Sequence, residues 1–109
     1  MSLDIWLTMD TGGPEPASVG ESMNITGNVA RMWTAAGCYD ALYMSNGLLA
    51  ESHLIQLHAA IKDMEANPDK YEAMNPENGW GSYKSALPWL RKWTANCEAN
   101  PKAKISLWK

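Results

Sequence analysis

The sequence predicts a small α+β domain in which the N- and C-terminal strands pair in a small sheet packed against three to four helices. Three observations predict it. Residues 3–9 alternate apolar and polar side chains, as a half-buried strand does, and residues 103–109 alternate in the same way. Between them, apolar residues recur three and four positions apart, which is typical of helices. With 109 residues the chain has the length of one domain, residues 1–109.

The first predicted strand has an apolar side formed by Leu3, Ile5, Leu7 and Met9. Glycines and prolines in residues 10–16 end it and predict a loop that runs to about Gly20. Residues 21–27 are expected to be extended or irregular and able to add a short strand. Ile105 and Leu107 share one face of the last strand, which is the natural partner of the first. Because two strands alone are marginal, the helices must cover them or a second subunit must extend the sheet.

The helical pattern predicts helices over residues 28–36, 49–66, 68–73 and 82–98, with one helical turn after Cys38. Thr26 or Asn28 is expected to cap the first of these helices, and Gly37 to close it. The last helix has an inner row made of Ala86, Leu90, Trp93 and Cys97. Pro88 lies inside its span, so the helix either begins late, near Ser85, or is kinked.

The charges are unevenly distributed along the chain. The net charge is −3, which disfavours a general duplex-DNA binder. Residues 1–77 carry a net charge of −8 and residues 78–109 a net charge of +5. This pattern fits either two solvated faces of opposite sign or a local basic surface for a small anion.

Cysteine usage and the N-terminus favour a cytoplasmic protein. The first residues lack a basic, apolar signal peptide, and no apolar run approaches the ~18 residues that a membrane-spanning helix needs. Cys38 and Cys97 lie 59 positions apart without metal-binding spacing, so we expect reduced, buried thiols.

No motif predicts catalysis, a metal or a cofactor. His53 and His58 are five residues apart on one helix, about 140° around its axis, which is wrong for a metal pair. We therefore expect histidines at the edge of the core. A small nucleotide hydrolase or transferase that uses Cys38 or these histidines is the enzymatic alternative.

Two polar segments are candidates for a binding site. In the first, Asn24, Thr26 and Asn28 alternate, and Arg31 follows Asn28 by one helical turn. Capping and turn formation are the structural alternative. In the second, glycines flank Trp80, Asn78 precedes it, and Tyr83 and Lys84 follow, with Arg91 seven residues beyond Lys84. An aromatic ring beside amides and cations suits a nucleotide-type ligand, whereas a tryptophan that plugs the core is the alternative.

The aromatic composition bears on this choice, because the chain has six Trp and four Tyr but no Phe. Aromatic residues with a polar group therefore replace purely apolar ones. Trp33, Trp89 and Trp93 fall on or beside apolar stripes, so we expect them in the core or at an interface. Trp80 and Tyr83 are expected in a ligand site.

The chain resembles a family of short, mostly uncharacterised proteins of bacteriophages and actinobacteria. The resemblance rests on the opening segment 3–13, on Asn24-x-Thr26-x-Asn28, on 64–68, and on Asn75-Pro76-x-Asn78-Gly79-Trp80-Gly81-x-Tyr83. Pro88 departs from the family pattern. The family implies no established activity, but a phage setting suggests a protein that sequesters signalling nucleotides of bacterial immunity, such as cyclic ADP-ribose-like molecules or cyclic dinucleotides.

These observations predict a non-enzymatic binder of a nucleotide-type small molecule, acting as an anti-defence sponge in the cytoplasm of the bacterial host. Such sponges are typically oligomeric, so a homo-oligomer is expected. The candidate ligand-binding residues are Asn24, Thr26, Asn28, Arg31, Asn78, Trp80, Tyr83, Lys84 and Arg91. A protein–protein interaction module that inhibits a host protein, with exposed tryptophans as hot spots, is the other alternative.

Overall fold

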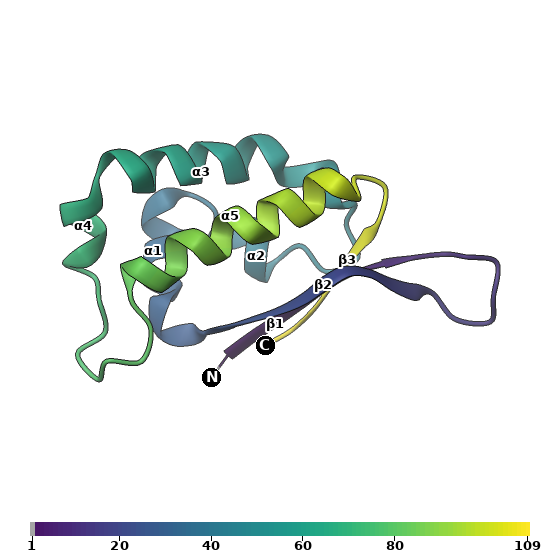
Figure 1. Cartoon of the computed structure of the whole chain (residues 1–109), viewed down its shortest axis with the longest axis horizontal. Coiled ribbons are helices and arrows are strands. Elements are labelled where there is room, and N and C mark those ends of the chain that lie inside the picture. The colour runs from purple at the N-terminus through teal and green to yellow at the C-terminus, as the bar shows by residue number, and fades with distance from the viewer. Residues whose placement is uncertain (1) are drawn as a thin grey trace.

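The computed structural model describes residues 2–109 and confirms an α+β fold. In this range β1 (Ser2–Met9), β2 (Ala17–Thr26) and β3 (Lys104–Trp108) form one antiparallel sheet in the order β2-β1-β3. The helices gather on one side of this sheet, and its other face is left open (Figure 1). The N- and C-terminal strands are neighbours, as predicted, with Ile5 opposite Leu107 and Leu7 opposite Ile105.

Alternation along β1 divides the sheet into an inner and an outer face. Leu3, Ile5 and Leu7 are fully buried against the helices, as expected. Met9 was expected on the same apolar side, but it is 37% exposed. The reason is that β1 and β2 run past the helices as a projecting hairpin arm, where no core is available to cover the side chain (Figure 1).

The second strand is longer than the sequence predicted. A loop was expected up to about Gly20, yet β2 begins at Ala17 and pairs with β1 through Met9↔Ala17. The pairing shifts register between Ile5 and Leu7, which marks a bulge. The third strand comes from the same chain, so the sheet does not need a second subunit to reach three strands.

Residues 2–109 contain five α-helices and two short 3-10 helices, more than the three to four expected. The predicted helix 28–36 is split into η1 (Gly27–Val29) and α1 (Ala30–Ala36), and α2 (Tyr39–Tyr43) follows. The predicted helix 49–66 begins as η2 (Ala50–His53) and continues as α3 (Leu54–Ala66). Two further helices are α4 (Pro68–Glu72) and α5 (Tyr83–Ala99). None of the described helices is long and apolar enough to cross a membrane.

The longest helix, α5, runs without a break through Pro88. It begins earlier than Ser85 because a capping box fixes its first turn: the Ser82 side chain accepts from the amide of Ser85, and the Ser85 hydroxyl accepts from the amide of Ser82. Proline removes the amide that would bond the carbonyl of Lys84, at an exposed position where water can replace it. Lys84 and Arg91 therefore lie on one continuous helix.

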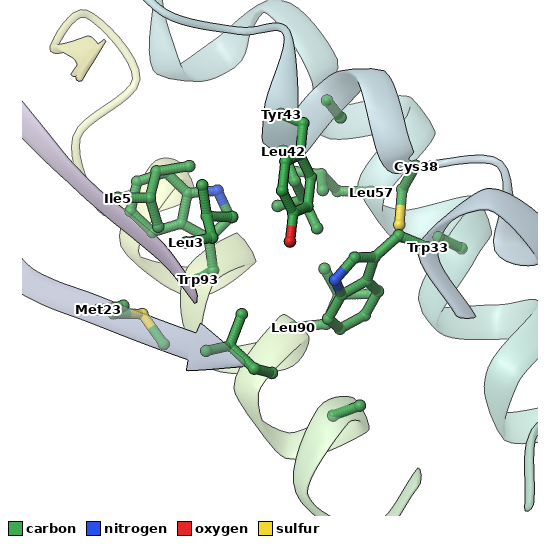
Figure 2. Packing of buried hydrophobic residues seen from close by; sticks show 14 of the residues in the cluster. Leu3, Ile5, Met23, Trp33, Cys38, Leu42, Tyr43, Leu57, Leu90 and Trp93 are labelled. Atoms are coloured by element: carbon green, nitrogen blue, oxygen red, sulfur yellow. The ribbon is translucent and has the colours of Figure 1, made fainter. Parts of the chain in front are cut away.

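The core lies between the sheet and helices α1, α3 and α5 (Figure 2). The predicted inner row of α5 is confirmed, since Ala86, Leu90, Trp93 and Cys97 are fully buried. Trp33 is also fully buried, as expected for a core tryptophan, and its ring lies 5.7 Å from that of the partly buried Trp89. Large rings from helices and branched residues from β1 thus fill one continuous core.

Candidate functional site

The structure brings the two candidate segments together. Gly81 lies so close to the end of β2 that an ideal Cβ there would be 2.6 Å from Thr26 Cγ2 and 2.9 Å from Val29 Cγ1. Arg31 Nη2 donates a hydrogen bond to the Met74 carbonyl at 3.2 Å. We call this place, made of residues 26–31 and 74–82, the junction. Two segments about fifty positions apart in the sequence therefore form one surface.

Within the junction, the turn that carries Trp80 is held in one shape. The Asn78 side-chain oxygen accepts from the backbone amide of Trp80 at 2.9 Å. Gly79 and Gly81 have φ angles of +75° and +92°, a region that side chains other than glycine rarely adopt. The Trp80 side chain is 72% exposed, so this residue is not a plug of the core. A large ring stands in solvent on a braced turn, an arrangement that folding alone does not require.

The first candidate segment is only partly aligned as expected. Asn24 and Thr26 lie on β2, but the chain turns into η1 at Gly27, so Asn28 leaves the alternating row. Thr26 is the cap, because its hydroxyl accepts from the amide of Asn28 at 3.3 Å. Asn28 is partly buried and Arg31 is exposed. Arg31 uses one N–H on Met74, which leaves further guanidinium donors for a ligand.

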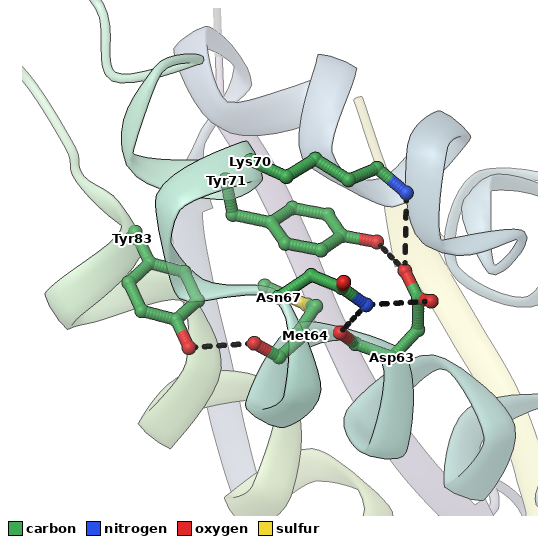
Figure 3. Close-up of polar contacts among 6 residues, drawn as sticks. All are labelled: Asp63, Met64, Asn67, Lys70, Tyr71 and Tyr83. Carbon is green, nitrogen blue, oxygen red and sulfur yellow. Dashed lines mark hydrogen bonds and ion pairs between the residues drawn. The ribbon is translucent and has the colours of Figure 1, made fainter.

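Tyr83 has a role in holding the helices together. Its hydroxyl donates to the Met64 carbonyl at 2.6 Å (Figure 3), and its amide donates to the Asn75 side chain at 2.8 Å. Its ring is stacked on that of Tyr71, with 6.1 Å between centroids. These contacts use both the polar group and one ring face, so Tyr83 supports the turn beside Trp80 more than it offers a free ring.

A polar cluster continues from Tyr83 across α3 and α4 (Figure 3). The Tyr71 hydroxyl donates to the Asp63 carboxylate, which also receives Lys70 Nζ at 3.3 Å. The Tyr71 hydrogen bond, followed by that from Lys70, lowers the pKa of Asp63. Burial, together with the neighbouring carboxylate, raises the pKa of Tyr71. The cluster fastens α4 to α3 through the contacts that Tyr71 and Lys70 make with Asp63.

The remaining candidates lie away from the turn or are already paired. Arg91 Nη2 lies 2.7 Å from Glu65 Oε2 of α3. Lys84 is exposed in the first turn of α5 and, within residues 2–109, forms no ion pair. Asn24 belongs to the outer face of the sheet, where its side-chain amide donates to Asp4 Oδ1 at 2.8 Å. The junction therefore gathers Thr26, Asn28, Arg31, Asn78 and Trp80.

Ion pairs also explain the uneven charge along the chain. Bases of the C-terminal third meet acids from earlier in the sequence. These pairs are Arg91–Glu65, Lys92–Glu21 at 2.9 Å and Lys102–Glu51 at 2.8 Å. Opposite charges that are far apart in sequence are thus paired on the folded surface, and half of the six C-terminal bases have an acidic partner.

The thiols and histidines do not assemble a reactive group. Cys38 and Cys97 are free and buried, as expected, and burial raises the pKa of each to about 12. Such a thiol is a poor nucleophile at neutral pH. His58 Nε2 lies 3.5 Å from Glu98 Oε1 at the surface. No group of three potential metal ligands occurs in the described part of the chain.

Sequence reasoning missed three residues on the outer face of the sheet: Asp4, Trp6 and Trp108. They line a hollow of about 490 Å³, together with Ser18, Ser22, Met23 and Asn24. The signal was present, because alternation that places Leu3, Ile5 and Leu7 inside must place Asp4 and Trp6 outside.

Comparisons with protein-family models, curated proteins and solved structures found no match to this chain.

Proposed function

We propose that the protein is a non-enzymatic binder of a nucleotide-type small molecule and that the junction is its binding surface. The exposed Trp80 ring on its braced turn is the observation that carries this proposal. An indole face supports stacking of a nucleobase, which contributes about 1–3 kcal/mol per base. Because the turn is already rigid, little conformational entropy is lost when a ring stacks there.

The groups around Trp80 match the other parts of a nucleotide. Arg31 retains guanidinium donors for a phosphate, and Lys84, four positions after Trp80 in the sequence, is a further exposed cation. The Asn78 oxygen is used by the turn, so its side-chain amide hydrogens are available to base or ribose oxygens. An aromatic ring, an amide and a cation are thus available to bind a nucleotide. The proposed function is binding alone and uses no activated nucleophile.

The resemblance to short phage proteins supplies a biological setting for this proposal. A protein that holds a cyclic ADP-ribose-like molecule or a cyclic dinucleotide without cleaving it would block an immune signal of the host bacterium. We also propose that the protein forms a homo-oligomer. Sedimentation velocity over a concentration series tests this, and a constant monomer mass would contradict it.

Titration calorimetry tests the binding proposal. The ligands are ADP-ribose, cyclic ADP-ribose and a panel of cyclic dinucleotides, each added to the native protein, to Trp80→Ala and to Trp108→Ala. Trp108 is 73% exposed, so its variant is a control of matched exposure. We expect Trp80→Ala to raise Kd by about tenfold or more and Trp108→Ala to leave it unchanged.

Two results would reject the proposal: no heat with any of these ligands, or equal affinities of the native protein and Trp80→Ala. Mass spectrometry of the ligand after long incubation distinguishes a binder from a nucleotide hydrolase. Intact ligand is the expected result, whereas accumulation of a cleavage product would establish hydrolysis.

A protein-interaction module is the second candidate function. It is favoured by Met44 and Leu48, which follow α2 and are 62% and 42% exposed. Exposed apolar side chains on one short segment can contribute to a protein-contact surface. Capture of one stoichiometric host protein that is lost with a Met44→Ser, Leu48→Ser double variant, and kept with Trp80→Ala, would support this function instead.

A further inference from the structure

We infer that the outer face of the sheet holds a second binding site, for a small organic cation such as a quaternary ammonium group. The hollow there has a volume of about 490 Å³, within the range of small-molecule pockets. The helices pack against the opposite face of the sheet, so this face is open to solvent (Figure 1). The lining of the hollow includes no residue of the junction, and this second site does not depend on the function proposed for the junction.

Strand register places two indoles around one carboxylate. Trp108 of β3 is directly opposite Asp4 of β1, and Trp6 is two residues further along β1 on the same face. Directly opposite side chains in an antiparallel pair have Cβ atoms about 5 Å apart, and diagonal neighbours are about 7–8 Å apart. A cation a few ångströms wide can therefore contact Asp4 and both rings at once. Trp108 is 73% exposed, so its ring is free to cover such a ligand.

The charge of the hollow selects for a cation. Of its lining residues, all of them in the described part of the chain, Asp4 alone is ionisable. One Asp4 oxygen accepts from Asn24 Nδ2 at 2.8 Å, which orients the carboxylate and leaves its other oxygen available. Across residues 2–109, no lysine or arginine forms an ion pair with Asp4.

Nearby bases do not neutralise this carboxylate. Lys109 follows Trp108, but its Nζ donates to the Tyr43 carbonyl at 3.1 Å. Lys104 is opposite Thr8, four residues from Asp4 along β1 and about 13 Å away at the strand rise. Lys92 lies 2.9 Å from Glu21. An anionic phosphate in the hollow would meet an unpaired negative charge, so the nucleotide proposed for the junction does not fit here.

The chemistry of the site is that of an aromatic cage. Indole is the best aromatic partner of a cation, which it attracts electrostatically within about 6 Å of the ring centroid. The Asp4 carboxylate adds a direct Coulomb attraction. Two serines and Asn24 also line the hollow. Methyl groups on the nitrogen suit the indole faces because they are apolar and spread the positive charge. A methylated ammonium therefore fits better than a strongly hydrated metal ion.

Nuclear magnetic resonance of the ¹⁵N-labelled protein tests this site through its tryptophan indole signals. The probes are choline and its neutral isostere 3,3-dimethyl-1-butanol, at constant ionic strength. We expect choline to shift the indole signals of Trp6 and Trp108 with a Kd on the order of 1 mM and to leave that of Trp80 unmoved. The neutral isostere is expected to bind at least about tenfold more weakly.

Two variants of the hollow and one control variant of the junction complete the test. Asp4→Asn keeps an acceptor for Asn24 while removing the charge, and we expect it to raise the choline Kd about five- to tenfold. Trp108→Ala removes one wall and is expected to abolish saturation, whereas Trp80→Ala should bind choline as the native protein does. A spectrum otherwise unchanged shows that each variant is folded.

Several outcomes would overturn the inference. Equal Kd values for choline and the neutral isostere would show that the hollow binds apolar groups without regard to charge. An unchanged choline Kd in Asp4→Asn would show that the carboxylate does not take part in binding. Shifts at Trp80 would place any cation binding elsewhere. Shifts of Trp6 and Trp108 with protein concentration alone would assign the face to a second copy of the chain. Nucleotide binding that depends on Trp80 would be unaffected by any of these results.

Discussion

The contact between Gly81 and the end of β2 gives a sharp test of the junction. In Gly81→Ala the new Cβ would lie 2.6 Å from Thr26 Cγ2 and 2.9 Å from Val29 Cγ1, against an ordinary contact of 3.4–4 Å. Thr26 and Val29 are β-branched and stiff, and Val29 is fully buried, so they cannot turn aside without cost. Overpacking of this kind costs about 1–3 kcal/mol. The positive φ of +92° adds about 1–2 kcal/mol for a residue with a side chain, which makes a total of about 2–5 kcal/mol.

Gly79→Ala is the matched control. Gly79 also has a positive φ, +75°, but no atom lies within 4 Å of an ideal Cβ there. Its variant should show only the backbone strain of about 1–2 kcal/mol. Urea unfolding followed by circular dichroism measures both variants, and the difference between them isolates the contact. If the two alanine variants lose the same stability, the turn does not pack on β2 and the junction is not one surface.

The other predictions follow from burial and hydrogen bonding. Trp80→Ala should change the free energy of unfolding by less than about 0.5 kcal/mol, whereas Trp33→Ala should cost about 3–5 kcal/mol; equal urea midpoints for the two variants would contradict the assignment of Trp80 to the surface. Tyr71→Phe removes the main hydrogen bond that lowers the pKa of Asp63, so a carboxyl-carbon titration should show this pKa rising toward its usual range. The stabilisation from the lowered pKa is present above the unfolded pKa and is lost as the pH falls through the folded pKa. The free energy of unfolding of Tyr71→Phe should therefore fall less on acidification than that of the native protein. An identical fall in the two proteins would show that this hydrogen bond does not lower the pKa of Asp63. Both cysteines have pKa values raised to about 12, so iodoacetamide at neutral pH should label them slowly until urea unfolds the chain; rapid labelling of the folded protein would show that the thiols are accessible.

Much of the fold was predictable because its patterns are local. The alternation in β1 and β3 and the inner row of α5 depend only on spacing, and the structure confirms them. The early start of β2 was missed because its first four residues include only one strong strand former, Val19, beside Ala17, Ser18 and Gly20. They are held by the ladder with β1, which is a non-local interaction. The start of α5 was uncertain from sequence because Pro88 suggested a break, while the cap at Ser82 decided the boundary.

Local sequence patterns do not determine which of the candidate site residues come together in the fold. Sequence spacing marked Trp80 and Arg31 separately, but only the fold shows that their segments touch through Gly81 and Met74. Tyr83 is a residue type that often stacks on ligands, so the sequence indicated a binding role. Its contacts with Met64 and Tyr71 could not be predicted, because they depend on how α3, α4 and α5 pack. Asp4 and Trp108 are brought together by strands at opposite ends of the chain, so no window of sequence contains the hollow.

The central position of β1 also determines when the sheet can be completed during synthesis. β1 leaves the ribosome before the other described elements, and β2 can pair with one of its edges as a local hairpin soon afterwards. Its other edge must wait for β3, which begins at Lys104. Pairing over such a separation is slow, and until it forms the edge of β1 is open to strands of other chains. Completion of the sheet therefore depends on β3, and premature termination before this strand should yield an aggregation-prone chain.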